Sequence, residues 1–251
     1  MAITEISQFF DERYQEIESY LSFLQDIEKS VQGGSPKLSN VDTQITPDQQ
    51  KILNASLYLQ LYNLVESTVS KFLEMVVNEI KKAERAPGDL GEELRREWVR
   101  SIARTHHDDL GAEKRLEAAL KMCEQLLQES PIADFTIERG GGGNWDDSSI
   151  EEMCKRLGCR LTISSDIRKE VKRHRRDDMG ALGIVKTLRN DLAHGSLSFA
   201  ECGNDVTVSE LQDITTVVGK YLREAITCFI SFIDSNISRS KPKIGQGEVV
   251  A

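Results

Sequence analysis

Proline, cysteine and long apolar runs are scarce in this chain, and each scarcity excludes a class of protein. Only five prolines occur among 251 residues, so long helices can continue without interruption. No run of about 18 apolar residues is present, which argues against a membrane span. The five cysteines are odd in number and include no CxxC pair, which argues against a disulfide framework or a zinc cluster.

The first twenty residues, MAITEISQFFDERYQEIESY, lack the basic start and apolar centre of a secretion signal. With no apolar run either, the chain is predicted to be cytoplasmic and to have no membrane partner. Hydrophobic residues at 39% and charged residues at 29% are normal for a globular protein that buries a core.

Positive charge is also scarce: 32 Lys and Arg face 41 Asp and Glu, which gives a net charge of −9. Such a chain repels nucleic acid at long range and needs a local basic patch to bind it. One dense run exists, RKEVKRHRRDD at 168–178. It is either a solvated face, a surface for an acidic partner protein, or an RNA contact. The RNA contact would use Arg168, Lys172, Arg173, Arg175 and Arg176.

Helical periodicity dominates the remainder of the chain. Apolar residues at spacings of three and four predict helices from about Ile6 to Ile27, over 47–84 and over 208–237. Capping boxes are predicted to open the second and third of these, with Thr46 and Gln49 at one and Thr207 and Glu210 at the other. Shorter helices are predicted over 91–106 and 112–129.

The region between these helices is predicted in less detail. Ser148 and Glu151 are expected to cap a short helix that stops at Gly158. Helix resumes after Ser165 and runs, with a break near Gly180, to His194, and SLSFAECGNDVTV is expected to be an extended loop. The pattern predicts an all-α fold: one up-and-down bundle over 1–238 with an inserted helical segment at about 88–165, and a flexible tail at 239–251.

Two features suggest ligand sites only weakly. His106 and Asp109 could meet on a helix, but no third metal ligand accompanies them. GGGGN at 140–144 lacks the preceding strand and the following Lys-Ser/Thr of a phosphate-binding loop. The sequence therefore predicts neither a metal nor a cofactor.

The stretch KTLRNDLAHGSLSF at 186–199 concentrates polar groups with chemical potential. The apolar residues just before it predict a packed helix that holds Arg189, Asn190 and His194 at its C-terminal end. Asn190 and His194 lie on one face, whereas Arg189 and His194 are about 140° apart around the axis. Two copies facing each other across a two-fold axis would bring an Arg and a His together better than one copy.

These groups suit RNA cleavage without a metal ion. A histidine can take a proton from a ribose 2′-hydroxyl or give one to the leaving oxygen. A guanidinium stabilises charge on phosphate oxygens, and an amide can orient either group. The alternative is an ordinary helix end, where His194 interacts with the helix dipole and Arg189 pairs with an acid.

RNDLAHG resembles the signature of the HEPN superfamily (higher eukaryotes and prokaryotes nucleotide-binding). The wider string over about 185–211 is similar to one bacterial branch of HEPN-like nucleases, in which a Ser-Phe-x-Glu-x-Gly loop leads to a Thr-capped last helix. RYQEIESYLSFL and LYNLVEST resemble the first two helices of that branch, and GGNWDDSSIEEMCKRLG its central segment.

The resemblance implies a HEPN-type helical bundle that forms a homodimer with a composite ribonuclease site. It implies catalytic roles for Arg189, Asn190 and His194, and a toxin or anti-phage defence role with RNA as substrate and a cognate antitoxin or defence partner. Relatives that a nucleotidyltransferase modifies carry a tyrosine where this chain has Ser196. The alternative within the superfamily is a non-catalytic scaffold that binds nucleotide, RNA or a partner protein.

Overall fold

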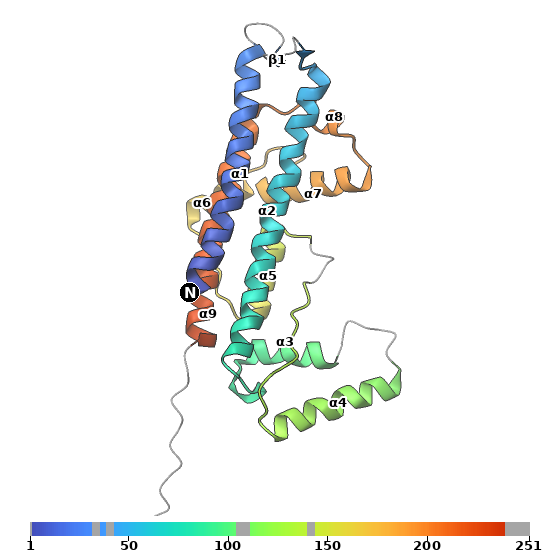
Figure 1. Cartoon of the computed structure of the whole chain (residues 1–251), viewed down its shortest axis with the longest axis vertical. Helices are drawn as coiled ribbons and strands as arrows, with labels where there is room; N and C mark the ends of the chain where they lie inside the picture. Colours follow the sequence, from blue (N-terminus) through green and yellow to red (C-terminus); the bar gives the residue numbers. More distant parts are fainter. Residues whose placement is uncertain (1, 32–35, 39–42, 104–110, 140–143, 239–251) are drawn as a thin grey trace, which may run out of the picture. The chain divides into compact units, whose positions relative to one another are not determined.

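The computed structural model describes residues 2–31, 36–38, 43–103, 111–139 and 144–238 (Figure 1). Helices make up most of this part, which confirms the all-α prediction. Two strands of two residues, β1 (Lys37–Leu38) and β2 (Thr43–Gln44), pair antiparallel. The α-helices are α1 (Ala2–Val31), α2 (Pro47–Lys82), α3 (Glu92–Ala103), α4 (Ala112–Leu127), α5 (Asp147–Leu157), α6 (Ser165–Lys172), α7 (Ala181–His194), α8 (Phe199–Cys202) and α9 (Val208–Ile233).

Two of the predicted capping boxes are confirmed. The Gln49 backbone N–H donates to the Thr46 hydroxyl at 3.2 Å, while the Thr46 N–H donates to the Gln49 side chain at 2.8 Å. Thr207 and Glu210 make the same reciprocal pair at 3.2 and 2.8 Å. Each box satisfies backbone donors that the first helical turn leaves unpaired, which fixes where α2 and α9 begin.

Two local predictions are wrong. The predicted Ser148–Glu151 box is replaced by one between Asp146 and Ser149, whose backbone N–H groups donate to each other's side chains at 2.7 and 2.8 Å. The predicted loop at 196–208 contains α8, because Ser198 and Glu201 form a capping box there. In both places a nearby polar pair with the same three-residue spacing satisfies the helix start.

The chain forms two compact units: unit 1 is Met1–Leu73, Arg139–Lys155 and Cys159–Phe229, and unit 2 is Glu74–Glu138, Arg156–Gly158 and Ile230–Ala251. The segment 88–165, which sequence analysis sets apart as an insertion, is therefore divided between them. Its helices α3 and α4 belong to unit 2, whereas residues 139–155 and 159–165 belong to unit 1. The tail at 239–251 lies outside the described residues.

Three long helices form the frame of unit 1. α1 runs antiparallel to α2, because Glu5 pairs with Lys71 at 2.7 Å while the Tyr20 hydroxyl donates to the Leu53 carbonyl at 2.7 Å. The rings of Phe72 on α2 and Phe229 on α9 stack with centroids 3.9 Å apart. These contacts enclose the predicted apolar faces, whose buried members include Phe10, Ile17, Leu21, Leu61, Leu64, Leu222 and Ile226.

α1 and α9 approach closely at a glycine. A Cβ at Gly219 would lie 2.5 Å from the Tyr14 ring, so a side chain there would clash with it. Arg223, one turn further along α9, pairs with Asp11 at 2.6 Å across the same helix pair. The absence of a side chain at Gly219 therefore allows the two helices to pack.

Unit 2 has its own buried centre. Trp98 on α3 is fully buried, and beside it the buried carboxylate of Glu97 pairs with Arg156 at 2.9 Å and with Arg100. Arg85 donates to the Ile237 carbonyl at 2.8 Å, which ties the segment after α2 to the π-helical turn Asp234–Ser238. None of the described helices is both long and apolar enough to span a bilayer.

Candidate active site at the end of helix α7

Helix α7 carries the three predicted catalytic residues in its last turns. Its first turns are packed in the core, where Ile184, Val185 and Leu188 are buried as predicted. Gly195 ends the helix with φ +72°, a left-handed conformation that glycine adopts without strain, and this agrees with its predicted place. The Ser196 N–H then returns to the Asp191 carbonyl at 2.9 Å. The helix end is therefore well ordered by its own backbone.

Arg189 lies against α2. Its guanidinium carbon is 4.5 Å from the centroid of the Tyr62 ring, which is buried. One terminal nitrogen is 3.9 Å from a carboxylate oxygen of Glu66, one turn further along α2. About a third of the Arg189 side chain remains exposed, at 33%. The cation is thus held in one place while part of its donor surface still faces solvent.

Asn190 links Arg189 to the loop before α5. Its side-chain oxygen accepts a hydrogen bond from Arg189 at 2.9 Å, and its amide nitrogen donates to the side chain of Asn144 at 3.1 Å. An amide can serve both contacts because it carries a donor and an acceptor. The residue therefore orients the guanidinium in this structure.

A second ion pair joins α7 to the segment just before α5, next to Asn190. Lys186, one turn before Asn190, pairs with Asp146, and the Trp145 backbone N–H donates to the Tyr62 hydroxyl at 3.4 Å. Burial alone would raise the pKa of Asp146, but hydrogen bonds from Lys186 and Ser149 outweigh it and hold the pKa below its ordinary value. Burial raises the pKa of Tyr62. The phenol therefore stays neutral under Arg189.

His194 stands apart from this cluster. It is the last residue of α7, it is exposed, and its side chain makes no hydrogen bond or ion pair with any residue that the structure describes. Arg189 is five residues earlier, which places it about 140° away around the helix axis. The structure thus brings Arg189 and Asn190 together and leaves His194 facing solvent at the helix end.

Five neighbours of the predicted residues were not identified from the sequence. Lys186 lies four residues before Asn190, a spacing that places both on one helix face and could have signalled it. The other neighbours come from distant segments, LYNLVEST on α2 and GGNWDDSS at the start of α5, and nothing in the local sequence connects these to α7. These neighbours are Tyr62, Glu66, Asn144 and Asp146.

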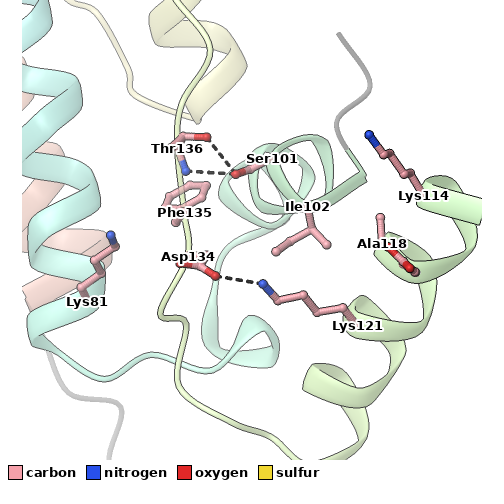
Figure 2. A pocket seen from close by; sticks show the side chains of 10 residues that line it. Lys81, Ser101, Ile102, Lys114, Ala118, Lys121, Asp134, Phe135 and Thr136 are labelled. Atoms are coloured by element: carbon pink, nitrogen blue, oxygen red, sulfur yellow. Dashed lines mark hydrogen bonds and ion pairs between the residues drawn. The ribbon is translucent and has the colours of Figure 1, made fainter. Parts of the chain in front are cut away.

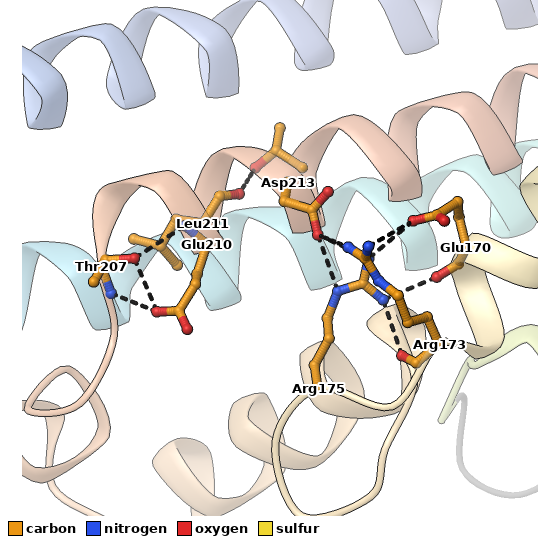
Figure 3. Close-up of polar contacts among 8 residues, drawn as sticks. Glu170, Arg173, Arg175, Thr207, Glu210, Leu211 and Asp213 are labelled. Carbon is orange, nitrogen blue, oxygen red and sulfur yellow. Dashed lines mark hydrogen bonds and ion pairs between the residues drawn. The ribbon is translucent and has the colours of Figure 1, made fainter.

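The basic run at 168–178 is engaged in contacts within the chain (Figure 3). Arg175 is nearly buried, at 12% exposed, and donates to Asp213 on α9 at 2.9 Å. Arg173 reaches the same carboxylate oxygen at 2.7 Å. Burial would raise the pKa of Asp213, yet hydrogen bonds and charge from these two arginines lower it. Part of the predicted basic patch therefore attaches the turn after α6 to α9.

The other members of the run are less constrained. Arg168 lies 3.4 Å from Glu151, and Arg176 donates to the Cys202 carbonyl at 3.3 Å. Lys172 lines a small pocket together with Asp147. An RNA contact through these residues stays a prediction.

Metal ligands do not cluster in the described residues: no group of three or more His, Cys, Asp or Glu side chains could hold an ion there. The His106–Asp109 pair and glycines 140–143 lie outside those residues. The arrangement at α7 can therefore supply a fixed cation, an amide and an exposed imidazole.

One of three comparisons with known proteins finds a match. A family model described as HEPN_MAE_28990-like HEPN matches residues 2–236. No curated protein and no solved structure matches the chain significantly.

Proposed function

Because the chain belongs to the HEPN_MAE_28990-like HEPN family, we propose that it is a metal-independent endoribonuclease of toxin or anti-phage defence type. The observation that carries the proposal is the immobilised but partly open guanidinium of Arg189 on the same helix end as the exposed His194. A fixed cation can stabilise charge on a phosphate, and an accessible imidazole can transfer a proton, and phosphodiester transesterification uses both groups.

Arg189 is suited to a pentacoordinate phosphate because its orientation is already fixed. Stacking on Tyr62 and the hydrogen bond to Asn190 remove rotamer freedom before substrate arrives. A guanidinium held in this way can donate to a phosphate oxygen as negative charge grows there, without reorganisation at that moment. Asn190 acts as a positioning residue for it.

His194 is suited to proton transfer because its ring is accessible. In the proposed step the imidazole accepts the proton of the ribose 2′-hydroxyl, and the 2′-oxygen forms a bond to phosphorus. The bond from phosphorus to the 5′-oxygen breaks, and the leaving oxygen takes up a proton from the imidazolium so formed or from water. The products are a 2′,3′-cyclic phosphate and a 5′-hydroxyl, and DNA is not cleaved because it lacks the attacking group.

A second copy of the chain completes the proposed site. Arg189 and His194 are separated around one helix, so a single copy presents them poorly to one phosphate. Two α7 ends related by a two-fold axis would each supply both side chains to a shared cleft. Sedimentation equilibrium should then give a dimer, and a strictly monomeric active chain would contradict this part of the proposal.

The test compares two histidine variants on total RNA in the presence of a chelator. His194→Ala should abolish cleavage, whereas His174→Ala, which removes an exposed imidazole from the basic run, should cleave within about twofold of the wild type. Gel-shift titration should show that both variants keep their affinity for RNA. If wild type and His194→Ala are equally inactive while RNA still binds, the non-catalytic scaffold is the better description.

A further inference from the structure

Helix α4 has an apolar face that nothing in the described chain covers. Leu116, Leu120 and Leu127 are 54%, 60% and 85% exposed, and Cys123 between them is exposed as well. Their spacing of four, three and four residues aligns them on one side of the helix. We call these four residues the leucine stripe. No residue of α4 is buried, so the helix contributes no side chain to the core of unit 2.

The inward side of α4 combines lysines with the half-buried Ala118 and Met122. Figure 2 shows Lys114, Ala118 and Lys121 on the side of α4 that lines a pocket of about 640 Å³. Lys121 pairs with Asp134 at 2.9 Å across that pocket. The leucine stripe lies on the opposite side of the helix from these lysines, by roughly 120–180° of rotation. An amphipathic helix normally buries its apolar face, whereas no described residue covers this one, which makes it a candidate contact surface.

The residues that border the leucine stripe indicate which charge a binding partner would have. Glu113, Glu117 and Glu124 are exposed and lie along one edge of the stripe, roughly 60–100° from its centre, where Glu117 also lines the rim of the pocket. The other edge is apolar, with Leu126 43% exposed. The stripe is therefore bordered by negative charge on one side, in a chain whose net charge is −9.

A second copy of α4 matches this surface poorly. In an antiparallel pair the two glutamate edges would face each other, and like charges would repel. In a parallel pair each glutamate edge would face alanine and leucine, which would leave carboxylates desolvated without a partner. A helix with leucines bordered by lysine or arginine meets neither problem.

We propose that α4 is a docking surface for an amphipathic helix of a partner protein, whose apolar face is bordered by basic residues. The leucine stripe would supply the buried contact, and Glu113, Glu117 and Glu124 would set the orientation of the incoming helix and exclude acidic ones. The proposal does not depend on RNA cleavage, because every residue it uses belongs to unit 2, whereas Arg189 and His194 belong to unit 1.

The test uses three synthetic peptides of about 20 residues and the full-length chain. The first peptide has leucines at the α4 spacing bordered by lysines, the second replaces those lysines by glutamates, and the third scrambles the first. Fluorescence anisotropy should show saturable binding of the lysine peptide, and binding of the other two weaker by about tenfold or more. Equal binding of the scrambled peptide would show attraction by net charge alone and would overturn the proposal.

Variants locate the binding on α4. Leu120→Ser combined with Leu127→Ser should lower the affinity for the lysine peptide by about tenfold or more. Gln125→Ser, on the opposite side of α4, should leave that affinity unchanged. Circular dichroism melts should be the same for the wild type and the leucine double variant, because the replaced leucines are already exposed. Glu117→Lys with Glu124→Lys should reverse the preference between lysine and glutamate peptides.

Two results would replace the partner helix by another occupant. If the leucine double variant turns a dimer into a monomer in sedimentation equilibrium, the stripe is an interface between copies of this chain. If the wild type binds neutral lipid vesicles and the double variant does not, with no peptide binding, the stripe contacts lipid. Either result would overturn the proposal.

Discussion

The Arg189 guanidinium lies on the face of the Tyr62 ring, 4.5 Å from its centroid, although the two residues are 127 positions apart in the chain. Through this contact α2 fixes the cation at the end of α7. The electron-rich ring face attracts the guanidinium and restricts its plane, but leaves its edge available to a phosphate. The proposed catalytic geometry therefore depends on a residue outside the RNDLAH string.

Replacement of Tyr62 should change the cleavage rate more than RNA affinity. Tyr62→Leu removes the ring face and should slow single-turnover cleavage by about tenfold, since a cation–π contact contributes about 0.5–2 kcal/mol. Tyr62→Phe keeps the ring and should retain most of the rate. If Tyr62→Phe is as slow as Tyr62→Leu, the hydroxyl contact with Trp145 is what matters, and the stacking argument is wrong.

Asn190→Asp should impair catalysis although the side chain keeps its shape. The new carboxylate would still accept from Arg189, but it would neutralise the guanidinium and lose the donor that now meets Asn144. We expect the rate to fall by about tenfold to a hundredfold in single-turnover assays. The matched control is Asn144→Asp, which changes the other partner of the Asn190–Asn144 hydrogen bond. It keeps Asn190 beside Arg189 and should reduce the cleavage rate less. Equal losses in the two variants would contradict a direct role for Asn190.

The Lys186–Asp146 pair should make stability depend on pH. Because the folded-state pKa of Asp146 is lowered, its contribution is present above the unfolded-state pKa and is lost as pH falls through the folded value. Lys186→Met should therefore lower the free energy of unfolding by about 1–2 kcal/mol near neutral pH, and by much less in strongly acidic buffer. Urea unfolding at both pH values measures the difference. A loss that is the same at both would show that packing of the Lys186 stem, not the ion pair, is responsible.

The basic run should separate into structural and binding residues. Arg175→Ala removes a nearly buried guanidinium that donates to Asp213 and to the Glu170 carbonyl, so we expect a loss of about 1–3 kcal/mol in stability by denaturant titration. Arg168→Ala removes an exposed ion pair with Glu151 and should lower the free energy of unfolding by less than about 1 kcal/mol. If Arg168 contacts RNA, its loss should also reduce the salt dependence of RNA binding. An unchanged salt dependence would argue against that contact.

The sequence predicts well what neighbouring residues determine. The caps at Thr46 and Thr207, the end of α7 at Gly195 and the buried stripe before Arg189 each depend on a few adjacent positions. The cap of α5 lies two residues before the predicted Ser148, because Asp146 forms a reciprocal box with Ser149 and also contacts Lys186, a residue distant in the sequence.

The supporting residues of the site could not be predicted in the same way. Tyr62 and Glu66 on α2 read as ordinary positions of a long amphipathic helix, and Asn144 follows a glycine run that gives no indication of its partner. Their proximity to α7 follows only from how the helices of unit 1 pack. The outward face of α4 was likewise hidden, since its leucine spacing alone predicts a buried face.

The chemistry of the cut ends tests the central claim most directly. Total RNA is incubated with the wild type in chelator, and the new 5′ ends are captured with a ligase that accepts only 5′-hydroxyl ends. A matching oligonucleotide with 2′-deoxyribose at the mapped position is then tested. Transesterification should give 5′-hydroxyl ends, 2′,3′-cyclic phosphates on the upstream fragments, and no cut in the deoxy substrate. Ends with 5′-phosphate, or cleavage of the deoxy substrate, would contradict it.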